Sequence, residues 1–184
     1  GKQTITTKGM KAEIRCVEKN AFRTVVEICH EMMIPSGMGE ELQRQREMCI
    51  DPYTRVANRS KELVPMEVKT VLTLEKSGKG LHVATTICNQ AKDHRVRVVM
   101  PTGLNTSTHL ADSAFEVVKR NNRHNDTWTN PCGCERQQCF AAMEDETNGL
   151  LVANRGLYEY EVLADEENAI AVTLLRSVAE MGDW

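Results

Sequence analysis

Arg176 is the residue whose type and position most directly suggest chemistry in this sequence. Counting every second residue from Ile170 puts Val172 and Leu174 on one apolar strand face and then places Arg176 on the same face. A buried guanidinium must meet an acidic group or a ligand, because leaving it unpaired costs roughly 3–5 kcal/mol. An internal salt bridge, or a strand end that emerges into solvent, explains the residue more simply than a ligand contact. All three interpretations stay open at this point.

A second group of reactive side chains consists of Cys132, Cys134 and Cys139, with His124 a few residues earlier. Thiolate and imidazole ligands close together in sequence are typical of tetrahedral zinc sites. The spacing here is C-x-C-x4-C, whereas common structural zinc sites use paired C-x2-C motifs. We therefore favour a loop with free thiols and assign no metal site in this chain. A zinc-dependent regulatory sandwich that uses these four residues stays an alternative, which metal analysis of the purified protein would separate.

The sequence offers no recognisable catalytic group. Carboxylates are numerous, but no spacing pairs two of them for acid–base chemistry. Ser113 does not lie in the G-x-S-x-G turn that presents a nucleophilic serine. The polar run from Lys92 to Arg95 is more simply a solvated loop with local hydrogen bonds. We predict that no catalytic residue lies within the chain.

Alternating apolar residues predict β-strands along most of the chain. The expected strands cover residues 11–17, 22–29, 66–74, 81–88, 95–100, 115–118 and 138–143, and lie within two further segments, 149–163 and 169–178. Two glycines in Lys76–Gly80 indicate a hairpin turn. Residues 36–63 are polar, and only Gly39–Met48 has helix-forming composition. Because this stretch has too few apolar residues for an amphipathic helix, we expect a polar connection containing no more than a helical turn.

Many short antiparallel strands and little helix predict an all-β fold, a large antiparallel β-sandwich. A length of 184 residues suits one domain, so residues 1–184 are interpreted as a single β-sandwich domain. The chain begins with Gly1 and stops at Trp184 directly after a strand, which favours a fragment of a larger protein.

Charge and composition exclude several classes of partner. The net charge is −3, and Lys and Arg are scattered among Asp and Glu, so we expect no nucleic acid and no membrane partner. No apolar run is long enough to span a membrane. Seven cysteines, an odd number, do not form a disulfide framework. Cys16, Cys29 and Cys88 are interpreted as small buried side chains in a reducing compartment, and the protein as cytoplasmic.

Five blocks of sequence resemble, in the same order, successive blocks of bacterial glycoside hydrolase family 38 α-mannosidases. They are Leu63–Lys76, Cys88–Thr102, Ala111–Val118, Val152–Val162 and Leu174–Val178. The first sixty residues match only loosely. The resemblance covers most of residues 63–178, and five blocks in order make chance agreement improbable.

The resemblance implies a galactose mutarotase-like supersandwich at the C-terminal end of a multidomain retaining enzyme. Such enzymes hydrolyse terminal α-mannosides or mannosylglycerate-type substrates. Their zinc and their nucleophilic aspartate belong to an N-terminal α/β catalytic domain, which a helical bundle follows. By resemblance, this chain would be non-catalytic, would hold no cofactor, and would pack on that catalytic domain and helical bundle to complete the mannoside cleft. An edge strand left exposed would also pair with a second copy, so a homo-oligomer is a further expectation.

The resemblance also suggests residues that face the substrate cleft. Arg176 occupies a position similar to that of an arginine that points toward the sugar in relatives. Asn154, Arg155 and Tyr160 are weaker candidates, because Asn-Arg-Gly is typical of a turn and the tyrosine of an ordinary strand. The cysteines at 132–139 depart from the family pattern.

A stand-alone carbohydrate-binding sandwich is the alternative function. Such modules usually stack sugars on exposed aromatic side chains. This chain is only 4% aromatic, and Trp128 is its one obvious loop candidate. The composition therefore favours a domain that packs on an enzyme over a lectin-like module.

Overall fold

The protein is described by a computed structural model covering residues 4–56, 58–123, 127, 133–164 and 167–177. These residues form mainly antiparallel β-sheets, which confirms the all-β prediction. They divide into two compact units, a first unit up to His94 and a second unit from Arg95 to Ser177. The single-domain interpretation stays a prediction. No helix in the described ranges is long and apolar enough to cross a membrane.

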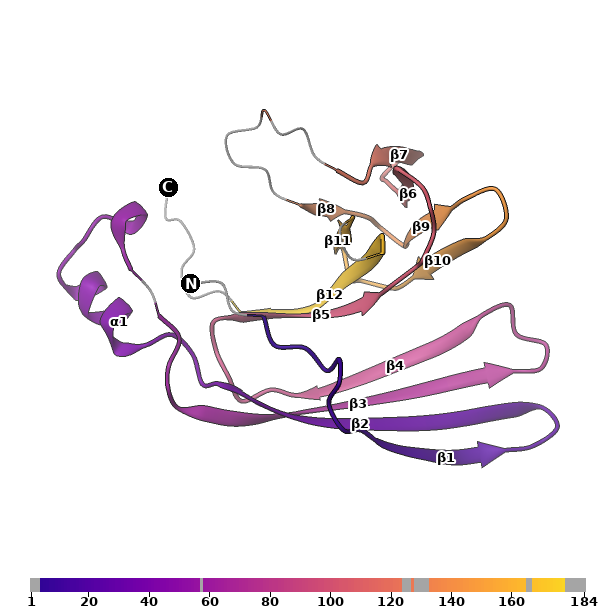
Figure 1. Cartoon of the computed structure of the whole chain (residues 1–184), viewed down its shortest axis with the longest axis horizontal. Helices are drawn as coiled ribbons and strands as arrows, with labels where there is room; N and C mark the ends of the chain where they lie inside the picture. The colour runs from indigo at the N-terminus through magenta and orange to yellow at the C-terminus, as the bar shows by residue number, and fades with distance from the viewer. Residues whose placement is uncertain (1–3, 57, 124–126, 128–132, 165–166, 178–184) are drawn as a thin grey trace. The chain divides into compact units, whose positions relative to one another are not determined.

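The first unit is built on one four-stranded sheet. Its strands are β1 (Glu13–Lys19), β2 (Arg23–Pro35), β3 (Leu63–Glu75) and β4 (Leu81–Cys88), which pair in chain order (Figure 1). The register places Val26 opposite Leu72 and Leu72 opposite Val83. The expected strands and the 76–80 hairpin are therefore confirmed, and β2 continues six residues beyond its predicted end at residue 29.

This sheet has one apolar face and one charged face. The apolar face carries Ile14, Val26, Ile28, Val68, Leu72, Val83 and Ile87. On the other face, the carboxylate of Glu27 receives Arg15 from β1, at 2.6 Å, and Lys69 from β3. The alternation in the sequence thus fixes both the register and the face of each side chain.

The connection between β2 and β3 contains a full helix, α1 (Glu40–Glu47), and a 3-10 turn, η1 (Pro52–Thr54). The expectation of no more than a helical turn is wrong. Side-chain pairs explain the helix: Gln43 bonds Glu47 at 3.0 Å, and Gln45 bonds Glu41 at 2.9 Å. Leu42 is its single buried residue.

Asp93, next to the start of β5, forms hydrogen bonds with residues near both ends of this connection. Its Oδ2 accepts from the backbone N–H of Met38 at 3.0 Å, and its carbonyl accepts from Arg59. Asp93 itself adopts a left-handed backbone conformation with φ of 61°. The sequence indicated a loop with local hydrogen bonds before β5. In the structure this loop instead positions the β2–β3 connection, more than thirty residues away in the sequence.

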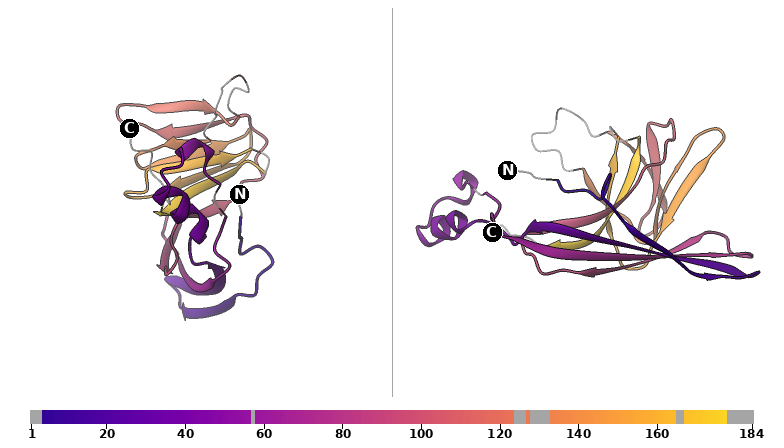
Figure 2. Two further views of the ribbon diagram at one scale, coloured as in Figure 1. Left: turned by 90° about the vertical axis from the view of Figure 1, so that its left-hand side faces the viewer. Right: turned by 60° about the horizontal axis from the view of Figure 1, so that its bottom comes forward.

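The second unit is a small sandwich of two four-stranded sheets (Figure 2). One sheet has the order β10 (Gly149–Ala153), β9 (Phe140–Glu144), β6 (Thr108–Asp112) and β7 (Val117–Asn121). The other has the order β5 (His94–Met100), β12 (Ala169–Ser177), β11 (Glu159–Leu163) and β8 (Cys134–Arg136). Their shared core consists of Leu104, Ala111, Ala141, Met143, Val152, Tyr160, Ile170 and Val172.

The cysteines that the structure describes are all free thiols. Cys16 and Cys88 are exposed and Cys29 is half-buried, so the prediction that these three are buried is wrong. Cys16 lies on β1, the edge strand of its sheet, which leaves that side chain open to solvent. His124, Trp128 and Cys132 lie outside the described residues.

Candidate functional site

Arg176 belongs to a cluster of five charged side chains on the sheet β5-β12-β11-β8. We call this set the arginine–glutamate cluster; it consists of Arg95, Arg97, Glu159, Glu161 and Arg176. Arg95 lies 3.3 Å from Glu159 and 3.2 Å from Glu161, and Arg97 also pairs with Glu161. Arg176 pairs with the second oxygen of Glu159. Three guanidinium groups and two carboxylates leave the cluster with one net positive charge.

The strand pattern explains how these residues meet. The arginines alternate along β5 and the glutamates alternate along β11, so each pair lies on one face of its strand. Strand β12 separates β5 from β11, and it presents the small residue Ala171 directly opposite Glu161. Long arginine side chains can therefore reach over β12 to the glutamates.

Glu159 binds three side chains, those of Thr173, Arg176 and Arg95. Thr173 donates its hydroxyl to Oε1 of Glu159 at 2.8 Å, while Arg176 donates to Oε2. Burial raises the pKa of Glu159, but the Thr173 hydrogen bond and the charges of Arg176 and Arg95 together hold that pKa below its usual value. The carboxylate is therefore ionised, and it holds Arg176 in a fixed orientation.

Arg95 also contacts a cysteine from the predicted thiol cluster. Its Nη1 donates to Sγ of Cys134 at 2.7 Å. Burial lowers the pKa of Arg95, and the contacts with Cys134, Glu159 and Glu161 more than offset that effect and raise it. The guanidinium is thus permanently charged and bound on several sides.

The structure places the side chain of Arg176 half in solvent, with 52% of it exposed. The prediction that it is buried with the apolar set is wrong. Strand β12 is buried on both faces from Ala169 to Thr173 and then leaves the core, so its last residues lie at the edge of the unit. Arg176 therefore forms an internal ion pair and also lies where the strand end reaches solvent, which are two of the three interpretations of the sequence. A contact with substrate stays a prediction.

Tyr160 lies on the opposite face of β11 from the cluster and is completely buried. Its hydroxyl accepts from Arg120 at 2.8 Å, donates to Glu135 at 3.1 Å and lies 2.8 Å from His109 Nε2. These contacts are those of a core tyrosine, and a role in the substrate cleft is a separate prediction.

Asn154 and Arg155 lie in the turn between β10 and β11. Oδ1 of Asn154 accepts from the backbone N–H of Leu157 at 3.1 Å, and Gly156 has a φ of 86°. Asn154 therefore shapes the turn, as Asn-Arg-Gly indicates. Arg155 is exposed. Within the described ranges, no hydrogen bond or ion pair joins these two residues to Tyr160 or Arg176.

The described residues do not fit a metal ion. No group of three His, Cys, Asp or Glu side chains among them could hold one. Cys139 is exposed, and Cys134 contacts Arg95. A site that used His124 and Cys132 would involve residues outside the described ranges.

The cluster presents a positioned guanidinium that could orient a ligand. Both of its carboxylates form ion pairs with arginines. Arg176 remains half exposed, and its guanidinium has donors beyond the one bound to Glu159. Sequence reasoning missed Arg95, Arg97, Glu159 and Glu161. Their signal was the alternation Arg-Val-Arg in one strand and Glu-Tyr-Glu in another.

The sequence of this chain matches a known protein family and longer relatives. A model of the glycosyl hydrolases family 38 C-terminal domain matches residues 2–180. The chain is also 41% identical, over 179 residues, to a putative mannosylglycerate hydrolase from Halalkalibacterium halodurans. That match covers 97% of this chain and 20% of the relative.

Two solved structures share the fold. One is an α-mannosidase from Enterococcus faecalis V583, with a TM-score of 0.90 and 43% identity. The other is a protein in glycosyl hydrolase family 38 from Enterococcus faecalis, with a TM-score of 0.87 and 41% identity. Each match covers 98% of this chain and 20% of the solved one, so the chain spans about a fifth of the length of these relatives.

Proposed function

This chain belongs to the glycosyl hydrolases family 38 C-terminal domain family, and on that basis we propose that it is the non-catalytic C-terminal part of a larger retaining α-mannosidase. The observation that carries the proposal is the match over nearly the whole chain to a fifth of each relative. The mannosylglycerate hydrolase and the α-mannosidase among the relatives support terminal α-mannosides or mannosylglycerate-type glycosides as substrates.

The proposed role of this chain is to pack on its own catalytic domain and complete the substrate cleft. Arg176 is the residue we assign to the cleft. Glu159 and Thr173 fix its position, and half of its side chain is exposed, so it can donate to a sugar hydroxyl or to a carboxylate of the catalytic domain. Positioning by a residue held in this way lowers the cost of ordering the substrate.

We assign the zinc ion and the nucleophile to the part of the enzyme outside this chain. The described residues offer no group of three His, Cys, Asp or Glu side chains that could hold zinc. We further place the enzyme in the cytoplasm, because every described cysteine is a free thiol, the state that a reducing compartment maintains.

Activity of the full-length parent beside this chain tests the assignment. An aryl α-mannoside and a mannosylglycerate would each be offered, with and without zinc. We expect an active, zinc-dependent parent and an inert chain. Activity in the chain alone would overturn the non-catalytic assignment. An inactive parent together with glycan binding by the chain would favour the binding-module function.

Replacement of Arg176 in the full-length enzyme tests the cleft assignment. Arg176→Ala is expected to lower kcat/KM by roughly ten- to a hundredfold, the value of a lost charged hydrogen bond, with partial recovery in Arg176→Lys. Arg23→Ala is the matched control, because Arg23 forms a comparable pair with Glu18 and its side chain is 50% exposed. Equal kinetics for Arg176→Ala and Arg23→Ala would remove Arg176 from the cleft.

A further inference from the structure

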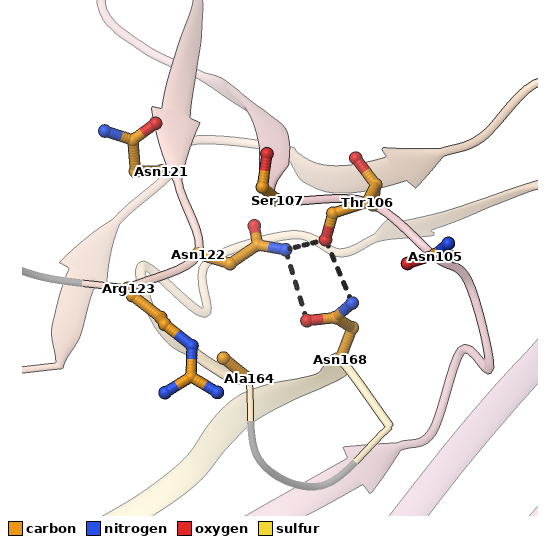
Figure 3. A pocket seen from close by; sticks show the side chains of 8 residues that line it. All are labelled: Asn105, Thr106, Ser107, Asn121, Asn122, Arg123, Ala164 and Asn168. Carbon is orange, nitrogen blue, oxygen red and sulfur yellow. Dashed lines mark hydrogen bonds between the residues drawn. The ribbon is translucent and has the colours of Figure 1, made fainter.

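The second unit contains a polar pocket that shares no residue with the arginine–glutamate cluster. The pocket has a volume of about 440 Å³ and lies among the β5–β6 connection, the end of β7 and the β11–β12 turn (Figure 3). It is lined by Asn105, Thr106, Ser107, Asn121, Asn122, Arg123, Ala164 and Asn168. Seven of these eight side chains are polar, and none is aromatic.

Two asparagines form a fixed polar base within the pocket. Nδ2 of Asn122 donates to the carbonyl of Thr106 at 2.8 Å and to Oδ1 of Asn168 at 3.2 Å. Nδ2 of Asn168 donates to the carbonyls of Leu104 at 2.9 Å and Thr106 at 3.0 Å (Figure 3). Asn122 is buried, and its Oδ1 faces His109 Nδ1 at 3.0 Å. Because both amides are held, the pocket does not need to be organised by its ligand.

The rim of the pocket presents polar side chains to solvent. The side chains of Asn105, Ser107 and Asn121 are exposed, and within the described part of the chain no hydrogen bond engages them. Arg123 adds a guanidinium to the same rim. The rim therefore offers two amides and a hydroxyl, each of which both donates and accepts.

We propose that this pocket binds a single polyhydroxylated ring, a monosaccharide or the terminal sugar of a glycan. Each sugar hydroxyl both donates and accepts, and amide and hydroxyl side chains match that pattern group for group. The volume lies within the range of about 300–1,000 Å³ typical of small-molecule sites. None of the described lining residues is aromatic, so their contribution to recognition consists of hydrogen bonds. The site is additional to the mannoside cleft of the proposed function.

Backbone amide NMR of the isotope-labelled 184-residue chain provides the test, with a dispersed spectrum as evidence that the chain is folded. Methyl α-mannopyranoside, methyl α-glucopyranoside and glycerol would be titrated separately. We expect saturable shifts confined to residues 104–107, 121–123, 164 and 168, with a dissociation constant on the order of 1 mM for a pyranoside. A mannose-terminated oligosaccharide distinguishes a glycan terminus from a free sugar by its relative affinity.

Variants of the rim locate the binding without disturbing the held asparagines. Asn121→Ala and Ser107→Ala should each weaken binding roughly fivefold, the value of one hydrogen bond. Asn148→Ala, which removes an exposed amide in the β9–β10 turn, should leave it unchanged. The proposal fails if no shift appears at pyranoside concentrations on the order of 50 mM, far above the expected dissociation constant. It also fails if glycerol binds as tightly as the pyranosides, or if the rim variants bind like the wild type.

Discussion

Tyr160 and His109 meet edge to face in the core of the second unit, with ring centroids 5.5 Å apart and an angle of 80° between the rings. The tyrosine belongs to β11 and the histidine to β6, so the contact joins the two sheets of the sandwich. Arg120 and Glu135 complete the hydrogen bonds of the hydroxyl. Burial, with the charge of Glu135, raises the pKa of Tyr160 against the opposing effect of Arg120, so the hydroxyl stays protonated.

Removing the Tyr160 hydroxyl should therefore cost more stability than its size suggests. Tyr160→Phe keeps the ring in the core but leaves Arg120, Glu135 and His109 each without one hydrogen bond. We expect the free energy of unfolding to fall by about 1–3 kcal/mol, the cost of unsatisfied buried polar groups. Urea denaturation measured by circular dichroism checks this.

Tyr158→Phe is the matched control, because Tyr158 is 62% exposed and lies two residues away. That substitution should change stability by less than about 0.5 kcal/mol. If both tyrosines behave alike, the network around Tyr160 does not stabilise the fold.

Gly156 should resist substitution for backbone reasons alone. Its φ is 86°, and no heavy atom lies within 4 Å of the position that a Cβ would occupy. Gly156→Ala should cost about 1 kcal/mol, because an L-residue rarely adopts this conformation. Gly80→Ala is the control: its Cβ would also meet nothing within 4 Å, and its backbone is not in the left-handed region. Thermal unfolding of the two variants should separate them, and equal Tm values would contradict the explanation.

Arg176→Ala in the 184-residue chain should have little effect on stability. The pair with Glu159 is half exposed on the arginine side, and such pairs contribute about 0–1 kcal/mol. A small loss of stability beside a large loss of kcat/KM in the full-length enzyme would assign the residue to function. A loss of several kcal/mol, measured by urea denaturation, would show that Arg176 mainly holds the sheet together.

Strand alternation allowed the sheet of the first unit to be predicted in detail. Val83 and Leu72 share a face because each belongs to a clean period-2 pattern joined by a short hairpin. The helix α1 was missed because the test for a helix was an apolar stripe. The helix instead forms through polar pairs such as Gln45 with Glu41, which leave no stripe in the sequence.

The arginine–glutamate cluster could not be assembled from the sequence. Arg95 and Glu159 are 64 residues apart in the sequence. They come together because β12 pairs with both β5 and β11 and so brings these two strands into one sheet. Alternation gives the face of each strand but not the order of strands in a sheet. The same limit applies to Arg176. Alternation put it on the face of Ile170 and Val172, but its guanidinium pairs with Glu159, which Thr173 binds from the other face of β12. Its exposure depends on where β12 leaves the core.

Acid should destabilise the protein through two glutamates of the second unit. Burial raises the pKa of Glu135, but the nearby His109 ring at 3.7 Å, the charge of Arg120 and the hydrogen bond from Tyr160 more than offset it. Its pKa, like that of Glu159, therefore lies below the usual 4.5. The unfolded chain then binds more protons than the folded one as pH falls below about 4.5. Their stabilising contribution is complete above that pH and is lost as pH falls through the folded-state pKa values.

Urea denaturation of the 184-residue chain between pH 7 and pH 3 should show this slope, and Glu135→Gln should make it shallower. Glu146→Gln, an equal charge change at an exposed turn, is the control, and the same slope in both variants would refute the assignment.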